Sequence, residues 1–158
     1  MFTVTKTYPH SLGLSAVFRQ PGAKSHCSRL HGYALEIKLV FEADELDSND
    51  WVIDFGSLKP VKQYLVDMFD HKLLVARHDP MKEHFAALED AGLAEIFYVD
   101  RVGCEGFAEH VGHFVVDWLK GQDLGIRFAG TPYARPRVRL RSVTVSEHAG
   151  NSATWEND

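Results

Sequence analysis

The segment 33–41 constrains the fold of this chain more than any other. Its alternate positions are hydrophobic and most positions between them are polar or charged; the hydrophobic set is Tyr33, Leu35, Ile37, Leu39 and Phe41. Successive side chains of a β-strand point to opposite faces, so this alternation predicts a strand with one face in a core and the other in water. Such half-buried strands are typical of antiparallel sheets. We therefore expect the chain to fold around an antiparallel sheet.

Two amphipathic helices are predicted to accompany that strand. Apolar residues recur at spacings of three and four along 58–69 and along 105–120, which places them on one side of each helix. Further strands are predicted at 1–6, 51–55, 96–99 and 138–145, a short helix at 81–92, and a surface loop at 121–136. This order of elements predicts an α+β fold with helices on one face of the sheet. The open edges of such a sheet are commonly covered by self-assembly.

Size and composition indicate one soluble domain covering residues 1–158. The chain has 158 residues, of which 45% are hydrophobic and 25% charged. No apolar run approaches the roughly 18 residues that span a bilayer, and the N-terminus has no signal-peptide core. A net charge of -5 argues against a nucleic-acid partner. Two cysteines are too few for a disulfide framework, so we expect a cytoplasmic protein without membrane or nucleic-acid partners.

A thiol lies four residues before a histidine in the segment 27–33. Cys27 belongs to a polar stretch just before the main strand, and His26 and Arg29 are its neighbours in sequence. The thiolate is the reactive form of cysteine, and a nearby cation or imidazole favours it. The alternative is a small packing residue without chemistry.

The main strand begins with a histidine that lacks an obvious metal-binding companion. Residues i and i+2 of a strand face the same side, so a His-x-His pair would present two imidazoles to one ion. Here the residue two positions after His31 is Tyr33. A phenol with a pKa of about 10 is a poor zinc ligand at neutral pH. His31 is thus either a metal ligand or a hydrogen-bonded structural residue.

Four further residues could take part in acid–base or binding chemistry. Asp70 and His71 follow a predicted helix end, and a carboxylate that orients an imidazole makes a general acid or base. Glu105 opens the last helix, where it also suits the helix dipole. Glu147 follows the last predicted strand, where a salt bridge is the ordinary role. Either glutamate could instead accept the two parallel donors of an amidine-like ring edge.

Taken in order, these motifs resemble those of the 6-pyruvoyltetrahydropterin synthase and 6-carboxytetrahydropterin synthase family. The segment 27–33 is similar to the family's Cys-x-x-x-His-Gly-His, 52–59 to its Val-x-Asp-Phe-x-x-Leu-Lys, and 69–74 to its Leu-Asp-His-x-x-Leu. The resemblance extends over nearly the whole chain. It implies the T-fold, or tunnelling fold, a four-stranded antiparallel sheet with two helices on one face. It also implies a homo-oligomer, a trimer or hexamer, with active sites between subunits.

The resemblance assigns a role to each candidate residue. Cys27 would be the general base, Asp70 and His71 from a neighbouring subunit the second acid/base pair, and Glu105 and Glu147 the anchors of a pterin ring. The implied substrate is 7,8-dihydroneopterin triphosphate or a related dihydropterin, in queuosine biosynthesis or another pterin pathway. Nearby basic residues are expected to hold the triphosphate; these are Arg19, Lys24 and Arg29.

Zinc is the cofactor that the resemblance implies, and this sequence departs from the family there. Of the three ligand positions, only one is histidine: the set is Phe18, His31 and Tyr33. A zinc site with three protein ligands cannot be built from one imidazole. His10 or His26 would have to supply the missing ligands.

The sequence therefore leaves two alternative functions. The first is a lyase acting on a pterin side chain, and the retained thiol, acid/base pair and carboxylates favour it. The second is a catalytically altered or inactive T-fold protein that binds a pterin or purine without zinc, and the two lost ligand positions favour that reading.

Overall fold

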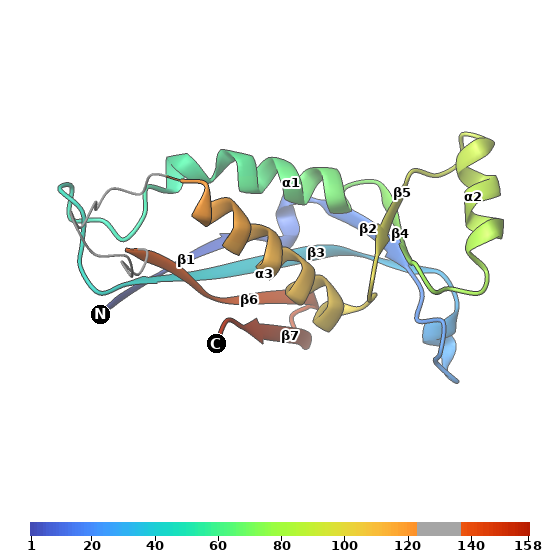
Figure 1. Ribbon diagram of the computed structural model, residues 1–158. Helices are drawn as coiled ribbons and strands as arrows, with labels where there is room; N and C mark the ends of the chain where they lie inside the picture. The colour runs from blue at the N-terminus through green and yellow to red at the C-terminus, as the bar shows by residue number, and fades with distance from the viewer. Residues whose placement is uncertain (123–136) are drawn as a thin grey trace.

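The computed structural model describes residues 1–122 and 137–158 as one seven-stranded sheet with three α-helices (Figure 1). The strands are β1 Phe2–Tyr8, β2 Leu14–Phe18, β3 His31–Ala43, β4 Lys72–Ala76, β5 Ile96–Val99, β6 Val138–His148 and β7 Asn151–Glu156. The helices are α1 Lys59–Phe69, α2 Lys82–Asp90 and α3 Cys104–Lys120. The predicted α+β class is confirmed. None of the helices in the described ranges combines the length and apolar character that crossing a membrane requires.

The long strand β3 organises the sheet. β1 and β2 pair antiparallel with its two successive halves, and β6 pairs antiparallel with residues 36–43. β7 then pairs antiparallel with β6. The expected antiparallel sheet is therefore present. It is larger than the four strands expected, because five strands pair antiparallel, and β4 and β5 extend the sheet from β2 in parallel register.

The core lies between β3, β6 and the two long helices. The hydrophobic face of β3 is buried as its alternation predicts, with Leu35, Ile37, Leu39 and Phe41 fully inaccessible. α1 and α3 cover this face, while α2 lies beyond β4 and β5 (Figure 1). The helices present the stripes that their spacing predicts, including Leu65 of α1 and Val111 of α3. Each fully buried large apolar side chain stabilises the fold by about 1.5–3 kcal/mol.

The strand predicted at 51–55 is wrong. This segment contains no strand, and a 3-10 helix at Phe55–Leu58 leads directly into α1. Val52 and Ile53 are both buried although they are adjacent, so the segment does not alternate. Asp54 caps the turn by accepting a 2.7 Å hydrogen bond from the Gly56 N–H. The loop predicted at 121–136 lies almost entirely outside the described residues.

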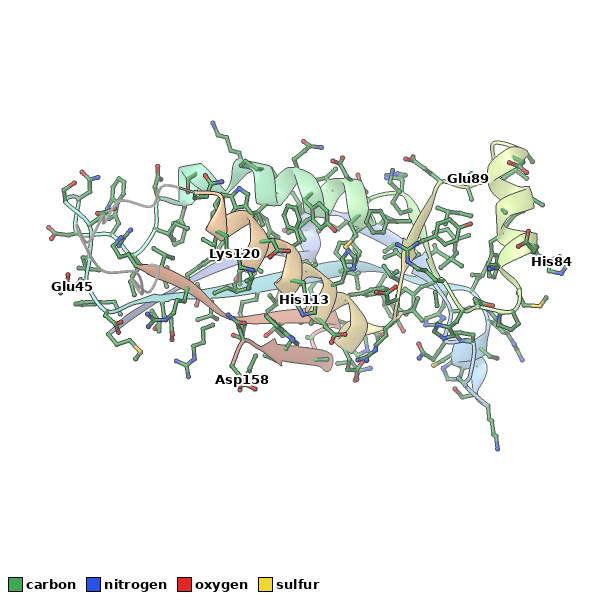
Figure 2. All side chains as sticks on the ribbon, viewed as in Figure 1. Glu45, His84, Glu89, His113, Lys120 and Asp158 are labelled. Carbon is green, nitrogen blue, oxygen red and sulfur yellow. The ribbon has the colours of Figure 1, made fainter. Side chains whose placement is uncertain are left out.

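The last strand, β7, was not predicted, and it docks on α3 through one tryptophan. Trp155 packs against Gly112, and its ring lies 5.5 Å from that of His113. Figure 2 shows His113 on α3, the helix that also carries Gly112. The end of β7 that carries Asn151 adjoins the end of β6 that carries Glu147. The docking therefore holds one wall of the cavity described next.

Candidate active site

An open cavity of about 230 Å³ lies where β2 and β3 meet at one end of the sheet, with Phe18 paired opposite His31. Its walls come from five separate parts of the chain: Phe18, Gln20, Cys27, His31, Gly103, Cys104, Glu105, Glu147, Asn151 and Ser152. Four of the residues singled out from the sequence are thus brought together, namely Cys27, His31, Glu105 and Glu147. We call this cavity the β2–β3 pocket.

A hydrogen-bonded loop presents Cys27 to the pocket. The Gln20 N–H donates to the Cys27 carbonyl at 2.8 Å, which closes the loop where β2 ends. Ser25 caps the short 3-10 helix His26–Ser28, because its hydroxyl accepts from the Cys27 N–H at 3.3 Å. The half-buried thiol therefore stands on a fixed turn.

Arg19 anchors this loop and does not reach the pocket. Its guanidinium donates to both carboxylate oxygens of Asp79, at 2.9 and 2.7 Å, and to the Ser28 carbonyl at 2.9 Å. Asp79 is only 2% exposed, and the Arg19 guanidinium, together with the Met81 N–H, holds the pKa of that carboxyl below its usual range. Three of its five guanidinium N–H groups are thus engaged within the chain, and the expectation that Arg19 holds a triphosphate stays a prediction.

Glu147 is the half-buried carboxylate of the pocket. Burial, followed by the negative charge of the nearby Glu147 carboxylate, raises the pKa of the Tyr33 phenol. The Cys104 thiol also lies close to Glu147 in the lining of the pocket. Burial, with the Glu147 and Glu105 carboxylates, raises the pKa of Cys104 to about 12. The carboxylate oxygens therefore lie beside two protonated neighbours, Tyr33 and Cys104.

The start of α3 brings the second carboxylate to the rim. Gly103 has a φ of 93°, a left-handed value that favours glycine, and this turn lets the chain enter the helix at Cys104. A side chain at Gly103 would lie close to the carboxamide oxygen of Gln20 and to a carboxylate oxygen of Glu105. Glu105 itself is exposed in the first helical turn. Gln20 carries no sequence signal and emerges only from the fold.

The three positions of the expected metal site do come together, but as an aromatic cluster. The Phe18 ring lies 4.9 Å from His31 and 6.1 Å from Tyr33, and the His31 and Tyr33 rings are 5.7 Å apart. Neither His10 nor His26 completes a site, because the described part of the chain holds no group of three residues of metal-binding type. The residues present do not fit a zinc ion.

Asp70 and His71 form a hydrogen-bonded pair away from this pocket. The His71 Nδ1 donates to the Asp70 carboxylate at 2.8 Å, a contact that adjacency in sequence does not predict. His71 has a left-handed φ of 57° and is exposed, and its N–H donates to the Ser15 carbonyl. His71 lines one hollow together with Ser15, whose side chain lies on the face of β2 opposite to Phe18. Within one chain, the pair is therefore separated from Cys27 by the sheet.

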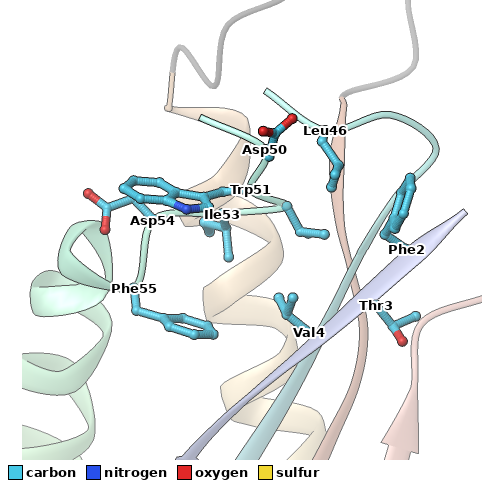
Figure 3. A pocket seen from close by; sticks show the side chains of 10 residues that line it. Phe2, Thr3, Val4, Leu46, Asp50, Trp51, Ile53, Asp54 and Phe55 are labelled. Atoms are coloured by element: carbon cyan, nitrogen blue, oxygen red, sulfur yellow. The ribbon is translucent and has the colours of Figure 1, made fainter. Parts of the chain in front are cut away.

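A second and larger cavity lies at the other end of β3. It measures about 480 Å³, and Figure 3 shows the rings of Trp51 and Phe55 on one side of it and Phe2 on the other. Its walls are mostly apolar and contain part of the 52–59 motif but none of the candidate catalytic, binding or metal residues. The chemistry-bearing side chains are thus concentrated in the smaller pocket.

Comparison with known proteins identifies relatives of this chain. The family model described as 6-pyruvoyl tetrahydropterin synthase matches residues 10–158. The 6-carboxy-5,6,7,8-tetrahydropterin synthase of Aquifex aeolicus is 28% identical over 109 residues, which are 68% of this chain and 65% of that protein. The match thus spans just under two thirds of that relative.

Solved structures show the same fold along the whole chain. An uncharacterized protein of Wolinella succinogenes has a TM-score of 0.72 at 17% identity, with 99% of this chain and 98% of that chain covered. The 6-pyruvoyl tetrahydropterin synthase of Plasmodium vivax has a TM-score of 0.62 at 15% identity, with 100% and 99% covered. The fold is thus the T-fold expected from the sequence. With the family model matched over most of its length, the chain belongs to the 6-pyruvoyl tetrahydropterin synthase family.

Proposed function

We propose that this protein is a lyase that acts on the side chain of a dihydropterin, either 7,8-dihydroneopterin triphosphate or a related dihydropterin. The observation that carries the proposal is the convergence of Cys27, Glu105 and Glu147 on one pocket. Family membership and the name of the Aquifex aeolicus relative support the same reaction class.

Glu147 is the residue we propose to recognise the pterin ring. The ring N–H and the exocyclic amino group of a pterin are two parallel donors, and one carboxylate accepts both in a short, charge-assisted pair. The Tyr33 hydroxyl and the Cys104 thiol beside it leave carboxylate lone pairs for such a ligand. Glu105 stands at the rim, where it closes on the exposed edge of the ring.

Proton transfer is assigned to Cys27 and to the Asp70–His71 pair of a neighbouring subunit. Cys27 removes a proton from the substrate side chain, and the imidazole acts from the other side of the substrate. Because His71 Nδ1 is held by Asp70, its Nε2 is the nitrogen available to exchange the proton. This assignment requires a homo-oligomer, a trimer or hexamer, since one chain keeps the two groups on opposite faces of β2.

A second candidate is a T-fold protein that binds a pterin or purine without catalysis. The aromatic residues at two of the three expected metal positions, Phe18 and Tyr33, favour it. Under this reading the carboxylates keep their binding role, while the Cys27 thiol has none.

Incubation with 7,8-dihydroneopterin and its triphosphate, followed by mass spectrometry of the products, separates the two candidates. A lyase shortens the side chain, and Cys27→Ala lowers its rate by about 100-fold or more while ring binding persists. Glu147→Gln presents an amide donor to the ring donors and weakens ring binding in either case. Binding without turnover leaves the second candidate, and absence of binding contradicts both.

A further inference from the structure

We propose that the Phe18–His31–Tyr33 cluster takes the place of a metal centre, so that the β2–β3 pocket works without a metal and selects a dihydropterin with a short side chain that lacks a triphosphate. This inference rests on the proposed function and narrows its substrate. It follows from what each residue of the cluster contacts and from the charges around it.

Phe18 occupies the first of the three expected ligand positions, and its side chain belongs to the hydrophobic core. Its ring is 2% exposed and packs edge-on against Phe107 at 5.1 Å, and Phe107 packs in turn against Phe69 at 5.5 Å. Its backbone lies directly opposite His31. A carbon ring has no lone pair to donate, so the side chain paired with His31 across the two strands cannot share an ion with it.

Tyr33 places a phenol at the third position. Its ring packs against the core and lies 5.7 Å from the His31 ring and 6.1 Å from the Phe18 ring. A phenol binds an ion only as a phenolate, and at neutral pH it is a poor zinc ligand. Tyr33 therefore packs with its two neighbours as an aromatic ring and does not act as a ligand.

His31 keeps a single free ring nitrogen. Its Nδ1 donates to the Arg29 carbonyl at 2.7 Å, which leaves Nε2 as the atom available to a ligand. One imidazole nitrogen suits a hydrogen bond to a ring or side-chain group, but it is too little for a zinc ion with three protein ligands.

The charge that one chain brings to the pocket disfavours a polyanion. Its described lining holds two carboxylates, Glu105 and Glu147, and neither lysine nor arginine. Arg19 is engaged by Asp79, and neither Lys24 nor Arg29 lines the cavity. A triphosphate would meet the like charge of these two carboxylates, whereas a short uncharged side chain would not. The expected ligand is a neutral dihydropterin.

The test compares the binding of 6-methyl-7,8-dihydropterin and 7,8-dihydroneopterin triphosphate by calorimetry, with a chelator and with added zinc. We expect the methyl compound to bind at least about tenfold more tightly, with no change on chelation or zinc addition. Tighter binding of the triphosphate, or binding that needs zinc, overturns this inference and leaves the proposed function standing. Absence of binding by either compound overturns both.

Installing the missing ligands gives a readout that is independent of activity. Zinc affinity is measured by competition with a chromophoric chelator for the wild type, for Tyr33→His, and for Phe18→His/Tyr33→His. We expect no stoichiometric zinc in the wild type and a gain in the variants; Tyr33→His alone suffices if imidazole in the core prevents folding of the pair. Tyr33→Phe is the matched control, with no gain of zinc. Stoichiometric zinc in the wild type that His31→Ala removes contradicts the proposal.

Discussion

The two cysteines of the β2–β3 pocket stand in different surroundings, and their reactivity should differ accordingly. Cys104 is buried at the start of α3, and burial together with two carboxylates raises its pKa to about 12. Cys27 is half-buried on a loop. Because the thiolate is the form that reacts, a maleimide should label Cys27 alone at neutral pH, as peptide mass spectrometry would show.

Matched single variants make this assignment secure. Cys27→Ala should abolish labelling of the folded protein, and Cys104→Ala should leave it unchanged. Loss of labelling on Cys104→Ala would mean that Cys104 is the reactive thiol, and it would remove the reason to place Cys27 at the reacting end of the substrate.

Sequence reasoning identified single residues of the site better than it identified their partners. Cys27 and Glu147 carry signals of their own, since one is a polar-loop thiol and the other a carboxylate that follows a predicted strand. The partner of Arg19 is Asp79, sixty positions away, and no local pattern announces such a pair. Gln20 and Cys104 join the pocket only because the fold brings the end of β2 next to the beginning of α3.

Among the elements, the loop that carries Cys27 depends on the Arg19–Asp79 ion pair. Removing one partner of a buried pair leaves an uncompensated charge, so Asp79→Asn should destabilise the protein by about 3 kcal/mol in urea unfolding. The loss should reach the site as well, because the same guanidinium holds the Ser28 carbonyl. Asp100→Asn is the matched control, since its pair with Arg77 is exposed and should matter little.

The same pair gives a pH dependence with a definite sign. The pKa of Asp79 is lower in the folded state, chiefly through Arg19, so the pair stabilises the protein above the ordinary aspartate value of about 3.9. That contribution disappears as the pH falls below this value toward the folded pKa. Asp79→Asn should therefore flatten the acid limb of the stability curve, and an unchanged limb would contradict the assigned pairing.

The docking of β7 on α3 depends on a missing side chain at Gly112. A Cβ atom there would lie 2.3 Å from the Trp155 ring, which no packing tolerates without a shift. We expect Gly112→Ala to lower the stability in thermal unfolding. Alanine stabilises a helix by about 1 kcal/mol relative to glycine, so a loss of stability would come from the clash with the ring.

A double-mutant cycle checks the cause. When Trp155→Ala is already present, the added Gly112→Ala should become neutral or stabilising, because the ring that it meets is gone. An equal loss in both backgrounds would show that Gly112 acts through something other than β7.

The long elements β3, α1 and α3 were predicted, and so were the short β5 and α2, whereas β4 and β7 were not. β3, α1 and α3 repeat one pattern over many residues, and their buried faces follow it. The segment 51–55 is a short apolar run, a pattern that occurs both in strands and in buried turns. A turn forms here, and Asp54 caps it. β4 is buried on both faces as a parallel strand, so it has no alternation to detect.

At the scale of the whole molecule, one chain does not contain the complete proposed machinery. The β2–β3 pocket holds Cys27, while Asp70 and His71 lie beside the residues that form the other face of β2. The outer edges of β5 and β7 are free in the described sheet order, and open edges are commonly paired with other chains. A cyclic assembly can bring one chain's thiol to the next chain's imidazole.

Subunit mixing tests this arrangement directly. Cys27→Ala and His71→Ala chains should each be inactive alone as lyases. After unfolding and refolding together in equal amounts, they should regain about a quarter of wild-type activity, because random mixing in a ring places an intact thiol beside an intact imidazole in that share of the sites. Mixing folded proteins without exchange is the control. If each site lay within one chain, every site in the mixture would still lack one group, and co-refolding would restore nothing.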